Sequence, residues 1–442
     1  MSCRFARFVV ALIVACATAA HAQSTPMKSL PWIAAWTASA QGPYPIGNPS
    51  AQPELKFAFP DAARGAVDQS FRLIVRPDVW GRQARLRLTN AFGTQPVPFD
   101  GVHVGLQASG SALLPGTNRG VTFGGKPSVT VAPGKDVLSD AVSLPFVKNA
   151  SDPMLAGRRL AVSFHVVGES GPMTWHAKAL TTSYVSAPGA GAHGAEEAEA
   201  SFPNSTASWY FLDQVQMQVP PGTRVIVAFG DSMTDGTAST LNGDDRWPDV
   251  FARRVHAVAG NRYAVVNEGI GGNEVIGPPD YAAKPIPGGP SALDRLQRDV
   301  ISLPGVAVVV WLEGINDFGA SRVSAQAVSD GVREGVKRLR EGIPGVRIYM
   351  ATLTGALNST PTHGTPDVEA KRQEYNRFIR GAGIFDGVID FDVVTLDRKT
   401  GELKTEYQPN STTGGPGDKL HPNRAGYAAM GGSIDLDMIL GK

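Results

Sequence analysis

Hydrophobic and polar residues alternate along the chain from about residue 57 to residue 210. In the segments 71–75, 85–88 and 160–166 apolar side chains recur at every second position, and glycine or proline turns lie between such segments. A period of two places the apolar side chains on one face of a strand. The pattern therefore predicts an antiparallel β domain, most simply a β-sandwich.

The pattern changes after residues 220–222, Pro-Pro-Gly, where short apolar runs begin to alternate with segments of helical period. The expected strands are residues 225–229, 263–266, 306–312, 347–353 and 388–391. The expected helices are residues 247–259, 291–301, 325–341, 367–381 and 423–439. Apolar strands joined by helices predict an α/β fold with a doubly wound parallel sheet, in which ligands bind at the carboxyl ends of the strands.

The first 22 residues have the features of a signal peptide. Arg4 and Arg7 form a basic start, residues 8–20 are mostly apolar, and residues 20–22, Ala-His-Ala, are an A-x-A cleavage site. We therefore expect a secreted or periplasmic protein, with a β domain over 23–220 and an α/β domain over 221–442. One alternative stays open, because residues 12–16 also resemble a lipoprotein processing site at which Cys16 would carry the lipid.

Composition limits the partners and cofactors. The chain has 442 residues, 42% hydrophobic and 18% charged, and its formal charge of +1 gives no reason to expect a nucleic-acid partner. Both cysteines, Cys3 and Cys16, lie in the processing segment, so cleavage after Ala22 leaves no thiol for a disulfide or a metal. Beyond that segment no apolar run approaches the roughly 20 residues of a membrane span. Nothing implies an obligate protein partner.

The first strand of the α/β region runs into residues 230–236, GDSMTDG. Glycine permits a tight turn from strand to helix, which places Ser232 near a helix N-terminus. There the serine N–H can point at a developing oxyanion. The alternative for an isolated Asp-Ser pair is that Ser232 merely caps the helix.

Three further segments carry candidate chemistry. After the second strand, residues 267–273, NEGIGGN, form a glycine-rich turn whose backbone N–H groups can approach a ligand closely. After the third strand comes Asn316, whose side-chain amide can donate to an oxyanion, although asparagine is also a common turn residue. Near the C-terminus Asp418 and His421 stand three residues apart, a spacing that lets a carboxylate orient an imidazole as a general base.

Together these four segments resemble, in order and rough spacing, the sequence blocks of the SGNH hydrolase family, also called GDSL esterases. The resemblance covers about residues 224–439 and implies a flavodoxin-like α/β fold. It implies that Ser232 is the nucleophile and that Asp418 orients His421. The oxyanion hole would consist of the N–H groups of Ser232 and Gly272 and the amide of Asn316.

The sequence departs from the family pattern in two small respects. The first block reads GDSM rather than GDSL, and Asn273 follows the glycine of the second block. A looser resemblance, carried by residues 289–296, 313–318 and 32–36, is to a bacterial branch that includes an arylesterase associated with xylan breakdown. That branch also places a β domain before the hydrolase domain.

The resemblance implies a serine esterase that hydrolyses short-chain esters, such as O-acetyl groups on a carbohydrate, through an acyl-enzyme. No cofactor or metal is then required, and the partner is a small-molecule or polysaccharide ester. Two alternatives stay open. One is a lipid or aryl ester hydrolase without a sugar preference, and the other is a non-catalytic protein whose β domain binds a glycan.

Other chemistry has less support in the sequence. Neither G-x-S-x-G nor H-E-x-x-H occurs. The remaining histidines beyond the processing segment are scattered, and we expect ordinary surface or core positions for all of them: His103, His165, His176, His193, His256 and His363. Trp32 and Trp36 could stack on a sugar ring, but aromatic residues four apart more often pack into a core or a domain interface.

Overall fold

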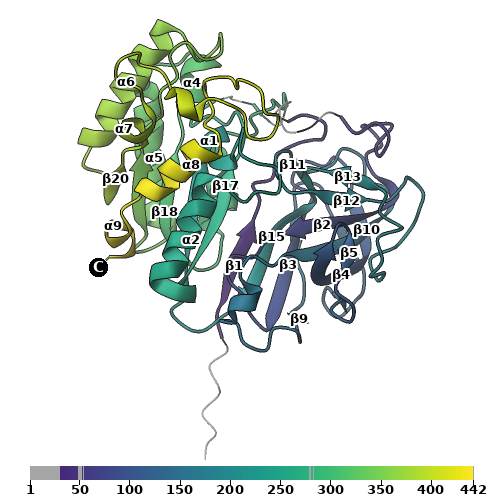
Figure 1. Ribbon diagram of the computed structural model, residues 1–442. Coiled ribbons are helices and arrows are strands. Elements are labelled where there is room, and N and C mark those ends of the chain that lie inside the picture. The colour runs from purple at the N-terminus through teal and green to yellow at the C-terminus, as the bar shows by residue number, and fades with distance from the viewer. Residues whose placement is uncertain (1–29, 48–51, 53, 278–279, 282, 442) are drawn as a thin grey trace, which may run out of the picture.

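The computed structural model describes residues 30–47, 52, 54–277, 280–281 and 283–441. The predicted signal peptide, with Cys3 and Cys16, lies outside these residues. Figure 1 shows an α/β part formed by the second half of the chain beside a β-rich part formed by the first half. The change in hydrophobic pattern near residue 220 therefore coincides with the change from β-rich to α/β structure.

The α/β part is built on one parallel sheet whose strands lie in the order β17-β16-β18-β19-β20. The strands are β16 (Arg224–Gly230), β17 (Tyr263–Gly269), β18 (Val306–Leu312), β19 (Arg347–Ala351) and β20 (Gly387–Ile389). Numbered along the chain this is the order 2-1-3-4-5, as in flavodoxin-like sheets. The prediction of an α/β fold is confirmed, and the strand order reverses at β16, where such sheets bind their ligands.

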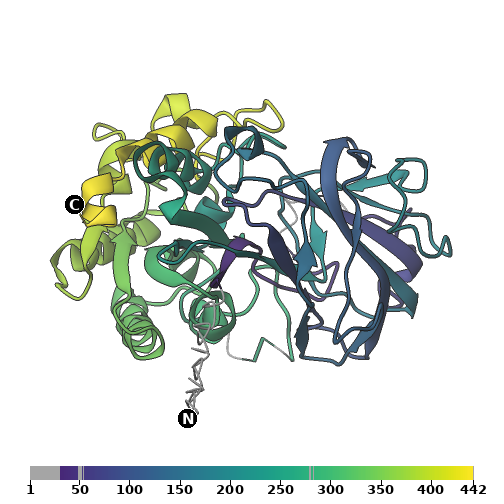
Figure 2. The ribbon, with the colours of Figure 1, turned by 90° about the horizontal axis from the view of Figure 1, so that it is seen from below.

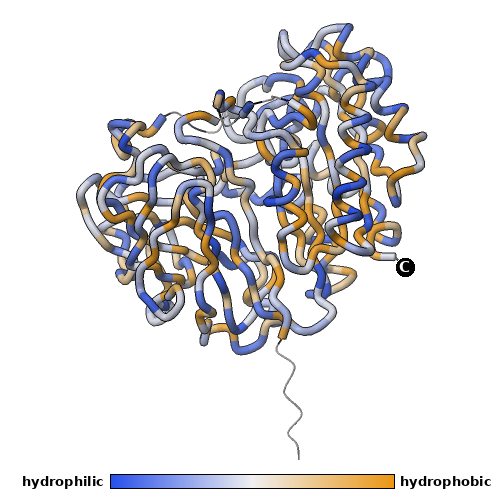
Figure 3. Tube along the Cα trace, turned by 180° about the vertical axis from the view of Figure 1, so that it is seen from behind, coloured by the Kyte–Doolittle hydropathy of each residue, from blue (hydrophilic) through white to orange (hydrophobic). Residues whose placement is uncertain are grey.

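The helices of this part form two groups, one on each face of the sheet (Figure 2). Contacts join α2 to α8 and α8 to α7 in one group, and α3 to α5, α5 to α6 and α6 to α4 in the other. The helices are α1 (Ser232–Asp235), α2 (Trp247–Ala259), α3 (Ala292–Leu296), α4 (Ile315–Gly319), α5 (Ala325–Gly342), α6 (Pro366–Gly381), α7 (Phe391–Thr395), α8 (Arg424–Ser433) and α9 (Leu436–Leu440). Apolar residues follow the central strands and polar residues the outer helices (Figure 3).

Several predicted boundaries are wrong for local reasons. The helix expected over 423–439 is two helices, because the Asp435 carboxylate caps α9 by accepting from the N–H groups of Asp437 and Met438. The strand expected over 388–391 ends at Ile389, because Asp390 caps α7 in the same way. The helix expected over 291–301 changes at residue 297 into a π-helical turn, Gln297–Ile301.

The β-rich part contains two larger antiparallel sheets and a two-stranded pair, β11-β14. One sheet has the order β1-β15-β3-β8 with β9 on β3, and the other has the order β13-β12-β2-β10-β4-β5 with β6 and β7 on β4. The strands are β1 (Trp32–Thr37), β2 (Val67–Val75), β3 (Gln83–Thr89), β4 (Val97–Ser109), β5 (Ala112–Leu113), β6 (Arg119–Gly120), β7 (Val129–Val131), β8 (Asp136–Leu138), β9 (Val142–Ser143), β10 (Leu160–Glu169), β11 (Trp175–His176), β12 (Ser183–Val185), β13 (Asn204–Thr206), β14 (Trp209–Tyr210) and β15 (Leu212–Gln218). The predicted antiparallel β region is confirmed, and its strands begin before and end after the predicted 57–210.

The two parts meet along β1, which pairs with β15 and also contacts β17, the edge strand of the parallel sheet (Figure 1). Across this contact the Ala34 N–H donates to the Pro304 carbonyl at 3.0 Å. Trp36 is buried with its ring edge-to-face on Trp209, 4.8 Å between centroids. Trp36 therefore packs where the two parts of the chain meet.

Candidate active site

Ser232 opens helix α1 directly after β16. The preceding residue caps this helix, because the Asp231 carboxylate accepts a 2.9 Å hydrogen bond from the N–H of Met233. The alternative that Ser232 is the cap is therefore wrong. The end of β17 packs closely on the same helix, since a Cβ on Gly269 would lie 2.2 Å from the Asp235 nitrogen. Only glycine permits this approach.

His421 lies between Ser232 and Asp418. Its Nε2 is 2.8 Å from Ser232 Oγ, and its Nδ1 is 2.5 Å from Asp418 Oδ2. A carboxylate beside Nδ1 keeps the proton on that nitrogen, so the lone pair of Nε2 faces the serine hydroxyl. The structure thus brings together three side chains that can pass a proton from a hydroxyl to an imidazole, although 189 residues separate Ser232 from His421.

The turn that carries Asp418 holds its carboxylate in the ionised form. The second oxygen, Oδ1, accepts hydrogen bonds of 2.9 Å from the N–H groups of Leu420 and His421. Burial acts to raise the pKa of Asp418, but these bonds and the His421 ring lower it well below its usual range. The carboxylate therefore remains charged and can orient the ring at any ordinary pH.

The glycine-rich turn after β17 lies against α1. Gly271 N–H donates to Asp235 Oδ2 at 2.8 Å, and Gly272 has a φ of +85°, a region that glycine adopts without strain. Among the described residues, no acceptor receives a hydrogen bond from the N–H of Ser232 or of Gly272. Both groups are free to bind an oxygen of a ligand.

Asn316 is on α4, just beyond the end of β18, and is 6% exposed. Its Nδ2 donates to the Asn273 carbonyl at 2.8 Å, which leaves one amide hydrogen for a ligand. The adjacent Asp317 ties α4 to the glycine-rich loop by accepting hydrogen bonds from the N–H groups of Val275 and Ile276. The amide predicted from sequence therefore lies next to the turn that carries Gly272.

Sequence analysis missed His363, which lies in the loop before α6. Its Nε2 is 3.1 Å from Asn316 Oδ1, and its Nδ1 is 2.9 Å from Thr360 Oγ1. Burial and the neighbouring His421 lower the pKa of His363 to about 4. The neutral ring donates from Nε2 to the amide oxygen of Asn316, so the Asn316 NH₂ group faces the opposite way. The one available signal was its position in the loop after β19, at the carboxyl edge of the sheet.

Asn273, the departure from the family pattern, has a structural role. Its Nδ2 donates to the carbonyls of Gly288 and Pro290, and its Oδ1 accepts from Arg295 Nε at 2.7 Å. Arg295 is fully enclosed and also donates to the carbonyls of Gly230 and Glu268, at the ends of β16 and β17. Asn273 and Arg295 thus hold the glycine-rich loop to both strands, and the Asn273 amide has no hydrogen left for a ligand.

Three buried carboxyl groups near the site are harder to ionise than usual. Burial raises the pKa of Asp317 to about 8 and that of Glu313 to about 7, and it raises the pKa of Asp231 well above its usual range. A neutral carboxyl group does not repel a negative charge that forms nearby. The surroundings of Ser232 and Asn316 are therefore compatible with a developing oxyanion.

Within the described ranges, no group of three or more His, Cys, Asp or Glu side chains is arranged to hold a metal ion. None of the helices in the described part of the chain is long and apolar enough to cross a membrane.

Comparisons with known proteins identify the α/β part. Residues 228–429 match the model of the GDSL-like Lipase/Acylhydrolase family. This stretch contains all five of the residues predicted as site residues, Ser232, Gly272, Asn316, Asp418 and His421. No curated protein matches the sequence.

Similar solved structures cover about half of the chain. A carbohydrate acetylesterase family member from Sinorhizobium meliloti is 20% identical, with a TM-score of 0.38, over 50% of this chain and 100% of that one. A GDSL-like lipase from Bacteroides thetaiotaomicron is 18% identical, with a TM-score of 0.36, over 50% and 90%. The aryl esterase of M. smegmatis is 18% identical, with a TM-score of 0.35, over 47% and 94%.

The family match and the strand order agree with the resemblance seen in the sequence blocks. The chain carries, over residues 228–429, an ester hydrolase domain of the GDSL-like lipase/acylhydrolase (SGNH) family.

Proposed function

We propose that the protein hydrolyses esters through Ser232, with His421 as the base and Asp418 holding the His421 ring. His421 Nε2 takes the Ser232 proton as Oγ attacks the ester carbonyl, and then returns it to the leaving alcohol. Water repeats the attack on the acyl-enzyme with the same base. No step needs a metal or a cofactor.

Three donors would hold the tetrahedral oxyanion: the N–H groups of Ser232 and Gly272 and the amide of Asn316. Their availability supports this role, since both backbone groups lack another acceptor among the described residues and the Asn316 amide retains one hydrogen. The single observation that carries the proposed mechanism is the pair of contacts of His421, 2.8 Å to Ser232 Oγ and 2.5 Å to Asp418 Oδ2.

We further propose a short-chain ester, such as an O-acetyl group on a carbohydrate, as the substrate. The looser resemblance to the xylan-associated branch is the basis for the sugar. The described surface is consistent with a short acyl group, because its exposed large apolar side chains are scattered over both parts rather than gathered as a lid. A lipase that acts on long chains would use such a lid.

The acyl preference can be measured with a series of nitrophenyl esters and with acetylated xylan. We expect acetate and propionate esters to be turned over far faster than esters of eight or more carbons, and acetate to be released from the xylan. A rate maximum at eight or more carbons, without acetate release, would support the lipid alternative instead. Turnover of nitrophenyl acetate without release from any acetylated glycan would support an aryl esterase.

The non-catalytic alternative is disfavoured by the contact between Ser232 Oγ and His421 Nε2, because a protein that only binds a glycan has no use for this pair. We also propose that the β-rich part forms a β-sandwich domain over residues 23–220 and that 221–442 is the hydrolase domain. Phe211, between β14 and β15, packs on Phe99 of β4 at 5.3 Å between centroids, and its carbonyl accepts from the Thr89 N–H of β3, so it links the two larger sheets.

Export is proposed from the first 22 residues, which lie outside the described structure. N-terminal sequencing of protein collected outside the cytoplasm should begin at Gln23 if the A-x-A site is used. A start at a lipid-modified Cys16, with the protein in the membrane fraction, would establish the lipoprotein alternative.

A further inference from the structure

A lysine of the β-rich part is buried beside the turn that carries Ser232. Lys178 is 1% exposed, and its Nζ donates a hydrogen bond to the hydroxyl of Thr237, two residues beyond the end of α1. No second acceptor for Nζ occurs among the residues described. Burial lowers the pKa of Lys178, and the charges of Asp235 and Asp418 oppose this effect.

A buried lysine with one hydrogen bond contributes little to the stability of a contact between two domains. The desolvation penalty of an ammonium exceeds what one hydroxyl contact recovers, and an unbranched apolar side chain would fill the same space more favourably. A role in positioning active-site residues would account for a lysine at this position despite its desolvation penalty. Two carboxylates near it, Asp235 and Asp418, belong to the active-site end of the hydrolase domain.

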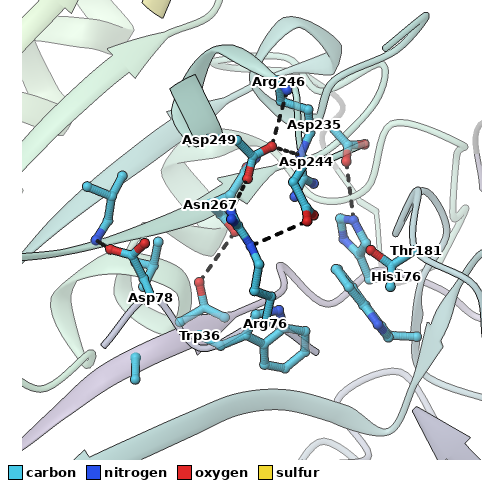
Figure 4. Close-up of a pocket in the computed structure, with 15 residues that line it drawn as sticks. Trp36, Arg76, Asp78, His176, Thr181, Asp235, Asp244, Arg246, Asp249 and Asn267 are labelled. Atoms are coloured by element: carbon cyan, nitrogen blue, oxygen red, sulfur yellow. Dashed lines mark hydrogen bonds and ion pairs between the residues drawn. The ribbon is translucent and has the colours of Figure 1, made fainter. Parts of the chain in front are cut away.

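A second side chain of the same segment, His176, also lies against α1. His176, at the end of β11, has its Nδ1 2.9 Å from the Ser39 carbonyl. Its Nε2 is hydrogen-bonded to the Lys178 carbonyl at 3.2 Å and lies 3.2 Å from Asp235 Oδ1, within ion-pair distance. Figure 4 shows this ring pointing from the β-rich part toward Asp235 of α1. The adjoining loops are also joined, since Asn242 N–H donates to the Leu180 carbonyl at 2.8 Å.

Thr237 is hydrogen-bonded to Ser232, and Asp235 is hydrogen-bonded to the residue next to Gly272. Thr237 N–H donates to the Ser232 carbonyl at 3.0 Å. Asp235 Oδ2 accepts from Gly271 N–H at 2.8 Å, and Gly271 is next to Gly272. The β-rich part therefore reaches both the nucleophile turn and the oxyanion turn.

We infer that the β-rich part completes the active site, with Lys178 and His176 as positioning residues that act through Thr237 and Asp235. Lys178 holds the turn of Ser232 by a hydrogen bond, and His176 lies at ion-pair distance from the carboxylate that bonds the turn of Gly272. Both roles rest on the proposed ester hydrolysis. The β-rich part is then a component of the catalytic unit rather than a separate binding module.

The test compares Lys178→Met and His176→Ala with the wild-type full chain. Active sites are counted by stoichiometric labelling of Ser232 with a fluorophosphonate, so that kcat refers to folded, labelled enzyme. We expect kcat on nitrophenyl acetate to fall by about 10-fold to 100-fold, the usual cost of a small misplacement of reacting groups, with KM nearly unchanged. Asn261→Ala is the control. The Asn261 side chain also joins the two parts, by donating to the Ala150 carbonyl, but it lies near the start of β17, at the end of the strand opposite the proposed site. Its kcat should equal that of the wild type.

Thr237→Val removes the hydroxyl that accepts the hydrogen bond from Lys178, so it tests the same contact from the hydrolase domain. This variant provides the test if Lys178→Met does not fold. Its kcat should fall similarly, and the double variant should be no worse than the poorer single variant, because both act through one contact. Unchanged kcat per labelled site in Lys178→Met and Thr237→Val would overturn the inference. Absence of labelling at Ser232 in the wild type would instead refute the proposed mechanism.

Discussion

The Ser232→Ala variant should lose hydrolysis of an aryl acetate almost completely, with kcat lower by about 10⁴-fold or more. The hydroxyl is the atom that attacks, and His421 Nε2 has no other hydroxyl as its partner among the described residues. Removing one oxygen should leave the fold intact, so the melting temperature should change little. Ser329→Ala is a matched control, because that buried serine only donates to the Ala325 carbonyl within α5. Retention of more than a few per cent of activity would exclude Ser232 as the nucleophile.

His421→Ala should be nearly as damaging, and the double variant with Ser232→Ala no worse, because the two side chains act as one unit. Asp418→Ala should cost less, since its role is to orient the ring. A loss equal to that of His421→Ala would contradict this division of roles. Because the pKa of Asp418 is held well below its usual range, protonation of this carboxylate should not limit activity at mildly acidic pH.

The Asn316→Ala variant should lower kcat by about 10²-fold to 10³-fold with little change in KM, the usual cost of one lost oxyanion donor. The substitution removes the Asn316 amide hydrogen that is not bound to the Asn273 carbonyl and is therefore available to the oxyanion. Asn204→Ala is a suitable control, since that side chain donates to the Ser186 carbonyl in the β-rich part. An unchanged kcat would place Asn316 outside the oxyanion hole.

His363 provides a second test of the same donor. Its ring fixes the Asn316 amide by donating to Oδ1, so His363→Ala should also lower kcat, and the double variant with Asn316→Ala should be no worse than Asn316→Ala alone. Additive losses would show that His363 acts by another route. Since the pKa of His363 is lowered to about 4, its ring should stay neutral well below neutral pH.

The sequence by itself determined the class of both parts and the local geometry of the site. The helix 247–259 and the strand 306–312 were predicted with the bounds that α2 and β18 have, because hydrophobic period reports which face of an element is buried. Ser232 at the end of a strand, and Asp418 three residues before His421, are short-range arrangements. The spacing of Asp418 and His421 indicated an oriented base, and the resemblance of the four segments to the SGNH blocks joined that base to Ser232.

Only the tertiary structure decided which distant side chains meet at that edge. His363 reaches Asn316 across 47 residues, and Lys178 reaches Thr237 across 59 residues from the other part of the chain. Neither contact can be predicted from hydrophobic periodicity. The sequence around a loop residue is compatible with a side chain that faces solvent, the core or the site. Their partners are set by how β1 and β17 bring the two parts together, and that packing depends on the whole fold.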